Sequence, residues 1–260
     1  MKKFLLLTAV TLLFFSCATD TQKDLEQARF YLDQGDYAKA KALVEPILAS
    51  EPNNNEAKFI LGSALVGNFA LSKKAGCKAT DTGYLGILAC LLEDSESTDT
   101  NGLKTFGRIA PEDSANNDDI AQAVSLLSDI TTYSSVLPEK DVALQRLVAR
   151  SFAISSLFQK VGANSDNLKC NSNLSDPNKD GIPDDYDTSN MTASDATLFI
   201  DNVGQLGVDA ETVGFNKKFN LIKRSKAIQD DLNAFGSVSK LVAVKLLFDG
   251  AYATHTTCDL

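Results

Sequence analysis

Several features on which enzymes and metal sites depend are scarce in this chain of 260 residues, which has one histidine and no tryptophan. A serine or cysteine triad needs a histidine base, and the single histidine, His255, lies in a polar stretch near the C-terminus. There is no Cys-x-x-Cys pair to indicate a zinc site, and no glycine-rich phosphate loop. The sequence therefore predicts that the protein is not an enzyme.

Clusters of basic residues are also missing. The chain has 25 lysine and arginine residues against 34 aspartate and glutamate residues, which gives a formal net charge of −9 and a pI near 4.7. Such a surface repels phosphate backbones, and no basic patch with interleaved aromatic residues offsets it. We therefore expect no nucleic-acid binding. The hydrophobic content of 44% is ordinary for a folded globular protein.

The apolar run at the N-terminus, residues 4–15, is too short to span a membrane. A helix needs roughly twenty apolar residues to cross the hydrocarbon region. This run follows Lys2 and Lys3 and is bounded by the small residue Ser16, so it predicts a signal peptide over residues 1–16 that is removed.

Ser16 and the next residue, Cys17, resemble the lipobox of bacterial lipoproteins, in which the cysteine is acylated and becomes the new N-terminus. Phe14 stands where that family usually has leucine. The resemblance implies lipidation of Cys17, a membrane-anchored tether over residues 17–24 and a position at the cell envelope. Ala18, in place of aspartate, is compatible with sorting to the outer membrane. The alternative is an ordinary secretory signal, which would still export the protein.

Export would place the other cysteines in an oxidising compartment. These are Cys77, Cys90, Cys170 and Cys258, an even number that indicates two disulfides. Four cysteines allow three pairings. We favour Cys77 with Cys90, which are near in sequence, and Cys170 with Cys258 by elimination. The alternative for Cys90, which lies in an apolar run, is a free buried thiol.

Apolar residues recur three and four positions apart along most of the mature chain, and no segment alternates as a half-buried strand would. The sequence therefore predicts an all-α fold. Helices are expected over residues 25–34, 38–51, 55–69, 84–92, 117–130, 138–161, 192–206, 219–235 and 237–248. The helix over 117–130 opens at Asn117, and Thr192 with Asp195 forms a candidate capping box for the helix over 192–206.

Residues 22–70 resemble the tetratricopeptide repeat, a helix-turn-helix unit of about 34 residues. The similarity is carried by Ala28, Tyr31, Gly35, Tyr37, Ala40 and Pro52, and a second unit opens in register with Leu61, Gly62 and Leu65. The early tryptophan is missing, and Ile47 stands where the family prefers alanine. The resemblance covers about one and a half repeats. We predict tetratricopeptide-like hairpins over residues 25–168 and a C-terminal helical segment over 191–260 that packs on them.

An Asp-rich loop over residues 169–190 separates these two parts and resembles a calcium loop. Its oxygen ligands would be the side chains of Asp176, Asn178, Asp180, Asp184 and Asp187 and the backbone carbonyl of Ile182. Pro183 has no N–H for the backbone pairing of an EF-hand, so the segment is closer to a thrombospondin type 3 loop. We predict a structural Ca²⁺ site with a Kd of about 10⁻⁴ to 10⁻³ M. The alternative is an Asp- and Asn-rich turn that binds nothing.

Two functions fit these features. The tetratricopeptide resemblance implies a scaffold in the cell envelope that binds a protein or peptide partner. The alternative is a ligand-binding accessory lipoprotein of a solute transport system, in which helices enclose an apolar pocket. A charged, open groove would favour the scaffold, and a closed apolar cavity would favour the accessory.

Overall fold

The computed structural model describes residues 20–71, 117–160, 188–215, 220–234, 236 and 238–248. Helices make up most of these residues and no strand occurs among them, which confirms the all-α prediction. The elements are α2 (Asp20–Asp33), α3 (Tyr37–Ser50), α4 (Asn55–Leu71), α7 (Asn117–Ser128), α8 (Glu139–Lys160), a 3₁₀ turn (Thr188–Asn190), α9 (Ala193–Val213), α10 (Asn220–Ala234) and α11 (Lys240–Phe248).

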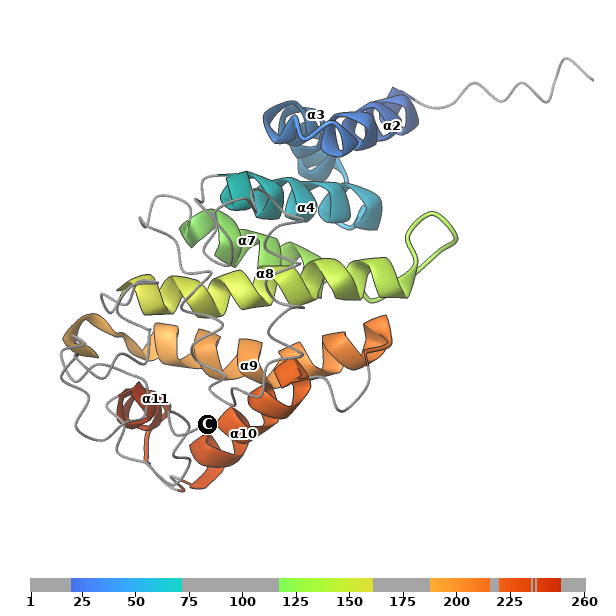
Figure 1. Ribbon diagram of the computed structural model, residues 1–260. Helices are drawn as coiled ribbons and strands as arrows, with labels where there is room; N and C mark the ends of the chain where they lie inside the picture. The colour runs from blue at the N-terminus through green and yellow to red at the C-terminus, as the bar shows by residue number, and fades with distance from the viewer. Residues whose placement is uncertain are drawn as a thin grey trace, which may run out of the picture.

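The first six of these helices form three antiparallel hairpins, α2/α3, α4/α7 and α8/α9, stacked in chain order (Figure 1). Each helix packs on the helices before and after it in this order. The first helices of successive hairpins also touch, α2 with α4 and α4 with α8, whereas the second helices make no comparable contacts among the described residues. Helices α10 and α11 pack on α9. This pattern, in which each unit contacts only its neighbours, is typical of helical-repeat proteins.

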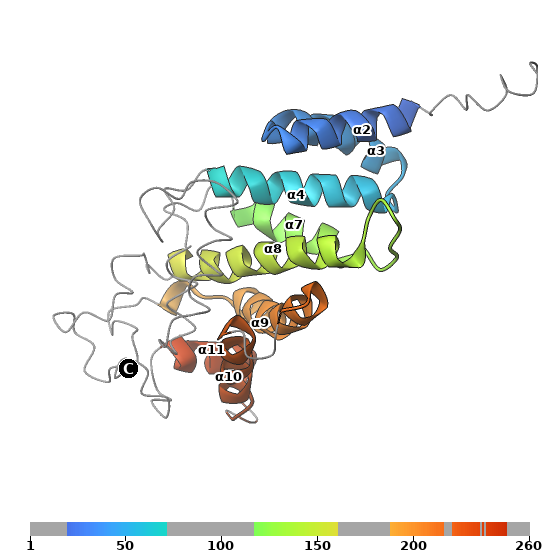
Figure 2. The ribbon, with the colours of Figure 1, turned by 45° about the vertical axis from the view of Figure 1, so that its right-hand side comes forward.

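The six hairpin helices begin and end at two opposite ends of the stack (Figures 1 and 2). The first end, which we name the tether end, holds the start of α2 at Asp20, the connection 51–54 and the connection 129–138. The opposite end, the far end, holds the last turns of α4 and α8 and the first turns of α7 and α9. Residues 72–116 and 161–187 therefore each connect two helix ends that lie at the far end.

The turn between α2 and α3 forms as the sequence indicates. Gly35 has a φ of +73°, a left-handed conformation that glycine adopts without strain. Asp36 then caps α3, because its carboxylate accepts hydrogen bonds from the backbone N–H and the ammonium of Lys39. These two residues close the first hairpin tightly enough for α2 and α3 to pack side by side.

Helix α9 is longer than expected, so the predicted end near Leu206 is wrong. The helix continues to Val213 and ends at Gly214, whose φ is +107°. Gly204 and Gly207 lie inside it, where an added Cβ would be 2.7 Å from the Gln229 side chain and 3.1 Å from Ser225 Oγ, respectively. These glycines therefore let α10 approach α9 closely and do not end the helix.

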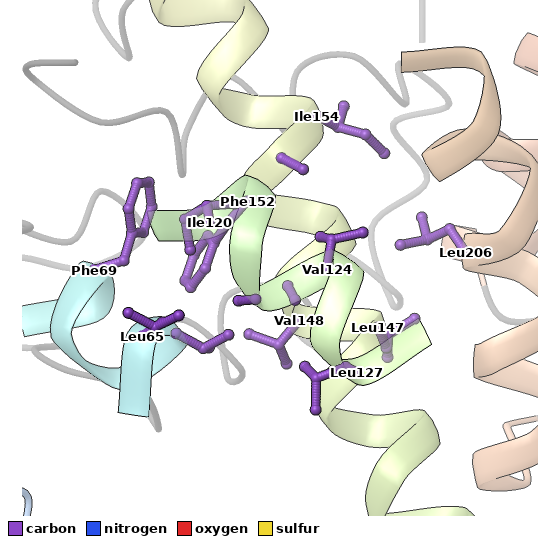
Figure 3. Close-up of a cluster of buried hydrophobic side chains, with 14 of the residues drawn as sticks. Leu65, Phe69, Ile120, Val124, Leu127, Leu147, Val148, Phe152, Ile154 and Leu206 are labelled. Atoms are coloured by element: carbon purple, nitrogen blue, oxygen red, sulfur yellow. The ribbon is translucent and has the colours of Figure 1, made fainter. Parts of the chain in front are cut away.

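Helices α4 and α8 form the centre of the core. Residues 60–67 of α4 and 147–157 of α8 are buried without interruption, so these segments are covered on every side. The rings of Phe69 and Phe152 lie 4.7 Å apart at their centroids and join the two helices. Figure 3 shows side chains of α4, α7 and α8 pointing toward this contact. The described parts of α4 and α8 consequently leave no open groove along the face that they share.

Among the described helices, α2 is the outermost one on the side of the stack opposite to α10 and α11 (Figure 1). Only Leu25 and Ala28 of this helix are buried, and its outer face carries charged and amide side chains with one exposed aromatic residue, Phe30. A polar outer face is what a terminal helix of a repeat stack requires. In the described part of the chain, no helix combines the length and apolar character needed to cross a membrane.

Candidate functional site

A hollow of about 830 Å³ lies at the far end between the first turns of α7 and α9 and the last turns of α8. We name it the end hollow. Its described lining comprises Asn117, Asp118, Ala121, Ala153, Ser156, Leu157, Lys160, Ser194, Asp195, Leu198 and Phe199. These residues come from segments that are more than thirty positions apart in sequence, so stacking of the helices creates the site.

The lining of the end hollow changes from apolar inside to polar at the edge. Ala153, Leu157 and Phe199 are buried and form the inner wall, where the small alanine side chain leaves space. Leu198 is 38% exposed and presents an apolar edge. Asp118 is exposed at the start of α7 and forms no ion pair with a described residue. The arrangement suits an amphipathic group with an apolar part inside and a positive charge beside Asp118.

The N-terminus of α9 forms one edge of the end hollow, and the predicted capping box is confirmed there. Thr192 Oγ1 accepts from the backbone N–H of Asp195 at 3.2 Å, and Asp195 Oδ2 accepts from the backbone N–H of Thr192 at 2.7 Å. Lys160 at the end of α8 donates to the same Asp195 oxygen at 2.6 Å. This contact joins the end of α8 to the start of α9.

The electrostatics of Asp195 follow from these contacts. Partial burial raises the pKa of Asp195, but the hydrogen bonds from Lys160 and Thr192 outweigh that effect and hold the pKa below its ordinary value of 3.8. Asp195 therefore stays ionised at neutral pH and Lys160 stays paired with it. Among the described lining residues of the end hollow, this leaves the carboxylate of Asp118 as the charge that is open to a partner.

A cluster of buried charges lies beside the end hollow in the interface of α8 and α9. Asp209 accepts from Arg146 Nε and Arg150 Nε, both at 2.8 Å. Arg150 also donates to Asn202 Oδ1 at 3.1 Å and to Ser128 Oγ at 3.0 Å. Arg150 is 8% exposed, so one buried guanidinium joins α7, α8 and α9. Burial raises the pKa of Asp209, and the positive charges of Arg146 and Arg150 oppose that rise.

The carboxylate and guanidinium groups of this cluster bind one another, so none of these charged groups is free for chemistry among the described contacts, and Asn202 Nδ2 is buried without a hydrogen-bond partner. Its geometry is that of a structural clamp between two hairpins. Among the described residues, no three His, Cys, Asp or Glu side chains gather as a metal site would need.

The site residues predicted from sequence lie outside the described residues. These are the lipidation site Cys17, the disulfide candidates Cys77, Cys90, Cys170 and Cys258, and the calcium ligands Asp176, Asn178, Asp180, Ile182, Asp184 and Asp187. The described chain stops at Lys160 and resumes at Thr188, where the 3₁₀ turn begins. Lys160 contacts Asp195 at the edge of the end hollow.

Sequence reasoning did not identify the Arg146, Arg150 and Asp209 cluster. Charged residues on amphipathic helices are usually solvated, and that expectation hides buried pairs. A signal was present, however. Asn202, Leu206 and Asp209 are four and three positions apart, so they share the face of α9 that packs on α8.

The described structure defines an all-α protein built from stacked helical hairpins. Comparison with protein-family models, with curated proteins and with solved structures found no match for the chain.

Proposed function

We propose that this protein is a lipid-anchored scaffold of the cell envelope that binds a protein or peptide partner in the end hollow. One observation carries the proposal: the hollow is open, and charged side chains from α7, α8 and α9 surround its apolar wall. An open site with a charged edge suits a peptide, which brings both apolar and polar groups. The alternative function, a solute-binding accessory, would need a closed apolar cavity.

The stacked hairpins support the same proposal. Helical-repeat stacks present rigid surfaces to partners, and here the Arg150 clamp and the contact of Phe69 with Phe152 hold the second and third hairpins together. The end hollow combines side chains of α7, α8 and α9, so a partner that binds there contacts two hairpins at once. Its binding depends on how these two hairpins are placed relative to each other. A fixed geometry lowers the entropy cost of binding.

A site-specific photocrosslinker tests the partner site. A benzoylphenylalanine residue is placed at Leu198, which lines the end hollow, or at Val208, which is exposed on the same helix outside it. We expect a discrete protein adduct in intact cells from position 198 and none from position 208. Asp118→Lys should weaken the adduct, because it reverses the open charge beside the site. Equal labelling at both positions would contradict the proposal, and a small-molecule adduct in a native mass spectrum would favour the accessory.

The anchor is tested separately. The resemblance of Cys17 and its neighbours to a lipobox supports a mature chain that begins at an acylated Cys17. The intact mass of the protein from membranes should exceed that of residues 17–260 by the mass of the lipid. Cys17→Ser should release the protein from membranes. An unmodified Cys17 would remove the anchor from the proposal and leave export in place.

We also propose that residues 176–187 bind one structural Ca²⁺ ion. The alternating oxygen-bearing residues and Gly181 support this site, and the described chain resumes at Thr188 directly after the last ligand, Asp187. Calorimetric titration with millimolar Ca²⁺ should give saturable heat for the wild type, and Asp180→Ala should abolish it. The absence of both heat and a shift of Tm in the wild type would refute the site.

A further inference from the structure

The connection between α7 and α8 carries an uncharged, exposed segment at the tether end. Residues 131–136 read Thr-Thr-Tyr-Ser-Ser-Val, and all six are exposed. Tyr133 is 39% exposed and Val136 is 59% exposed, which makes them two of the few large apolar side chains on the described surface. The buried residues Ile130 and Leu137 bound the segment on both sides. We name residues 131–136 the tip loop.

The tip loop is held in place by hydrogen bonds to α4 and α2 and by two bonds within its own connection. Asn55 of α4 donates to the carbonyl and the hydroxyl of Thr132, at 3.2 Å and 2.7 Å. Arg29 of α2 donates to the carbonyl of Val136 at 3.0 Å. Ser134 and Leu137 exchange backbone hydrogen bonds of 3.1 Å and 3.2 Å. The loop therefore presents Tyr133 and Val136 in a fixed geometry.

The tip loop lies at the same end of the stack as the start of α2 (Figures 1 and 2). Helix α2 begins at Asp20, three positions after Cys17. Three extended residues span at most about 10 Å, so a lipid on Cys17 would keep the tether end close to the membrane surface. Arg29, which contacts the loop, lies about 14 Å along α2 from Asp20. The anchor and the tip loop can therefore face one membrane surface together.

We propose that Tyr133 and Val136 of the tip loop insert into the interfacial region of the bilayer that holds the lipid anchor. The inference rests on the proposed anchor at Cys17. Tyrosine suits this region, because its ring is apolar and its hydroxyl can stay with water and headgroups. The charges around the loop are mixed: Asp129 pairs with Lys58, Lys140 stands between Glu139 and Asp141, and Arg29 contacts the loop. No excess of basic residues attracts an anionic surface, so the partner is a zwitterionic lipid surface.

Contact at this loop would set the orientation of the whole stack. The helices run between the tether end and the far end, and the 22 residues of α8 span about 33 Å. With the tip loop on the membrane, the end hollow faces away from it at about that distance. The site would then be open to partners from the aqueous side.

Tryptophan fluorescence tests this inference directly, because the chain contains no tryptophan. The chain from residue 18 is given an N-terminal hexahistidine tag and bound to phosphatidylcholine vesicles that contain nickel-chelating lipid. Tyr133→Trp places one reporter in the tip loop, and Leu198→Trp places a matched reporter at the far end. In ordinary phosphatidylcholine vesicles, we expect the Trp emission at position 133 to shift to shorter wavelength. In brominated phosphatidylcholine, we expect the emission to be quenched at position 133. The emission at position 198 should stay unchanged in both.

Each other outcome overturns the inference. If Trp emission at position 133 is not quenched while the protein is vesicle-bound, the tip loop does not enter the bilayer. Quenching at both positions would mean that the stack lies flat on the membrane. Val136→Asp in the Tyr133→Trp protein should reduce quenching, and circular dichroism checks that this variant is folded. Because the tag replaces the lipid, an unmodified Cys17 in cells would refute the anchor without changing this result.

Discussion

At the residue scale, Asp209 and its two arginines show how much depends on single side chains in the α8 and α9 interface. Asp209 and Arg150 are 3% and 8% exposed, so neither has water as a full alternative partner. Buried ion pairs of this kind add little net stability. Removal of one member, however, leaves the other as an unpaired charge in the protein interior, which is strongly destabilising. The clamp therefore specifies how α9 docks on α8.

Asp209→Ala should lower the free energy of unfolding by about 3–5 kcal/mol, because Arg146 and Arg150 lose their shared carboxylate. Asp201→Ala is the matched control on the same helix, since Asp201 forms an exposed pair with Lys240 and should cost at most about 1 kcal/mol. Urea unfolding of both variants compares the two costs. Equal losses would mean that the clamp contributes no more than a surface pair.

Gly67 is a second residue whose size decides the packing. A Cβ at this position would lie 2.3 Å from the ring of Tyr37, so α3 and α4 approach each other over a bare backbone. Gly67→Ala should destabilise the protein by about 1–3 kcal/mol through overpacking, although alanine normally favours a helix. Asn68→Ala, at an exposed neighbouring position, should be close to neutral or stabilising in thermal unfolding. A stabilised Gly67→Ala protein would contradict the close contact.

At the element scale, the start of α9 depends on the Thr192 and Asp195 capping box. Thr192→Ala should lower the free energy of unfolding by about 1 kcal/mol, because N–H groups of the first turn lose their acceptor. Thr212→Ala, at the other end of the helix, should change it by less than about 0.5 kcal/mol. Chemical unfolding of the pair separates a capping effect from a general loss of threonine.

Acid should weaken the same helix start. The pKa of Asp195 is held below 3.8 in the folded protein, so its contribution to stability is present at neutral pH and is lost as the pH falls through the folded value. Asp195→Asn should therefore be less stable than the wild type near pH 6, and the difference should shrink toward about pH 3. A difference that stayed constant over this range would show that the charge of Asp195 does not contribute.

The helices were predictable because each has a local signal. Apolar spacing located them, and Gly35, Asp36 and Thr192 indicated where turns and caps occur. The end of α9 was not predictable, because Gly207 looks like a helix terminator until α10 is seen to pack against it. The sequence around Gly207 does not show that α10, which comes later in the chain, packs against it.

The candidate site was less predictable than the fold. The end hollow needs Asp118, Leu157 and Leu198 from three helices, and no spacing rule joins such distant positions. The Arg150 clamp was hidden for a related reason, since burial of its charge depends on Asp209 in another helix, 59 positions later in the chain. Motifs within one segment, such as the calcium loop, remain sequence predictions whose residues the described structure does not include.

At the scale of the whole molecule, the contacts lie mainly between neighbouring helices. We therefore expect α2 and α3 to unfold independently of α8 and α9. Val44→Ala removes buried volume from α3 and should increase amide hydrogen exchange in α2 and α3, while α8 and α9 keep their protection. Phe152→Ala, at the central contact of α4 and α8, should increase exchange throughout and cost about 3–5 kcal/mol. Uniform exchange in the Val44→Ala protein would indicate one cooperative unit instead.

The polar outer face of α2 also limits how copies of this protein can associate. A repeat stack grows when its last helix offers an apolar stripe to the next unit, and α2 offers only Phe30 among charged and amide side chains. The described face of α2 therefore offers a second copy no apolar surface on which to extend the stack. Concentrated protein should remain as separate particles and should not polymerise into filaments through this end.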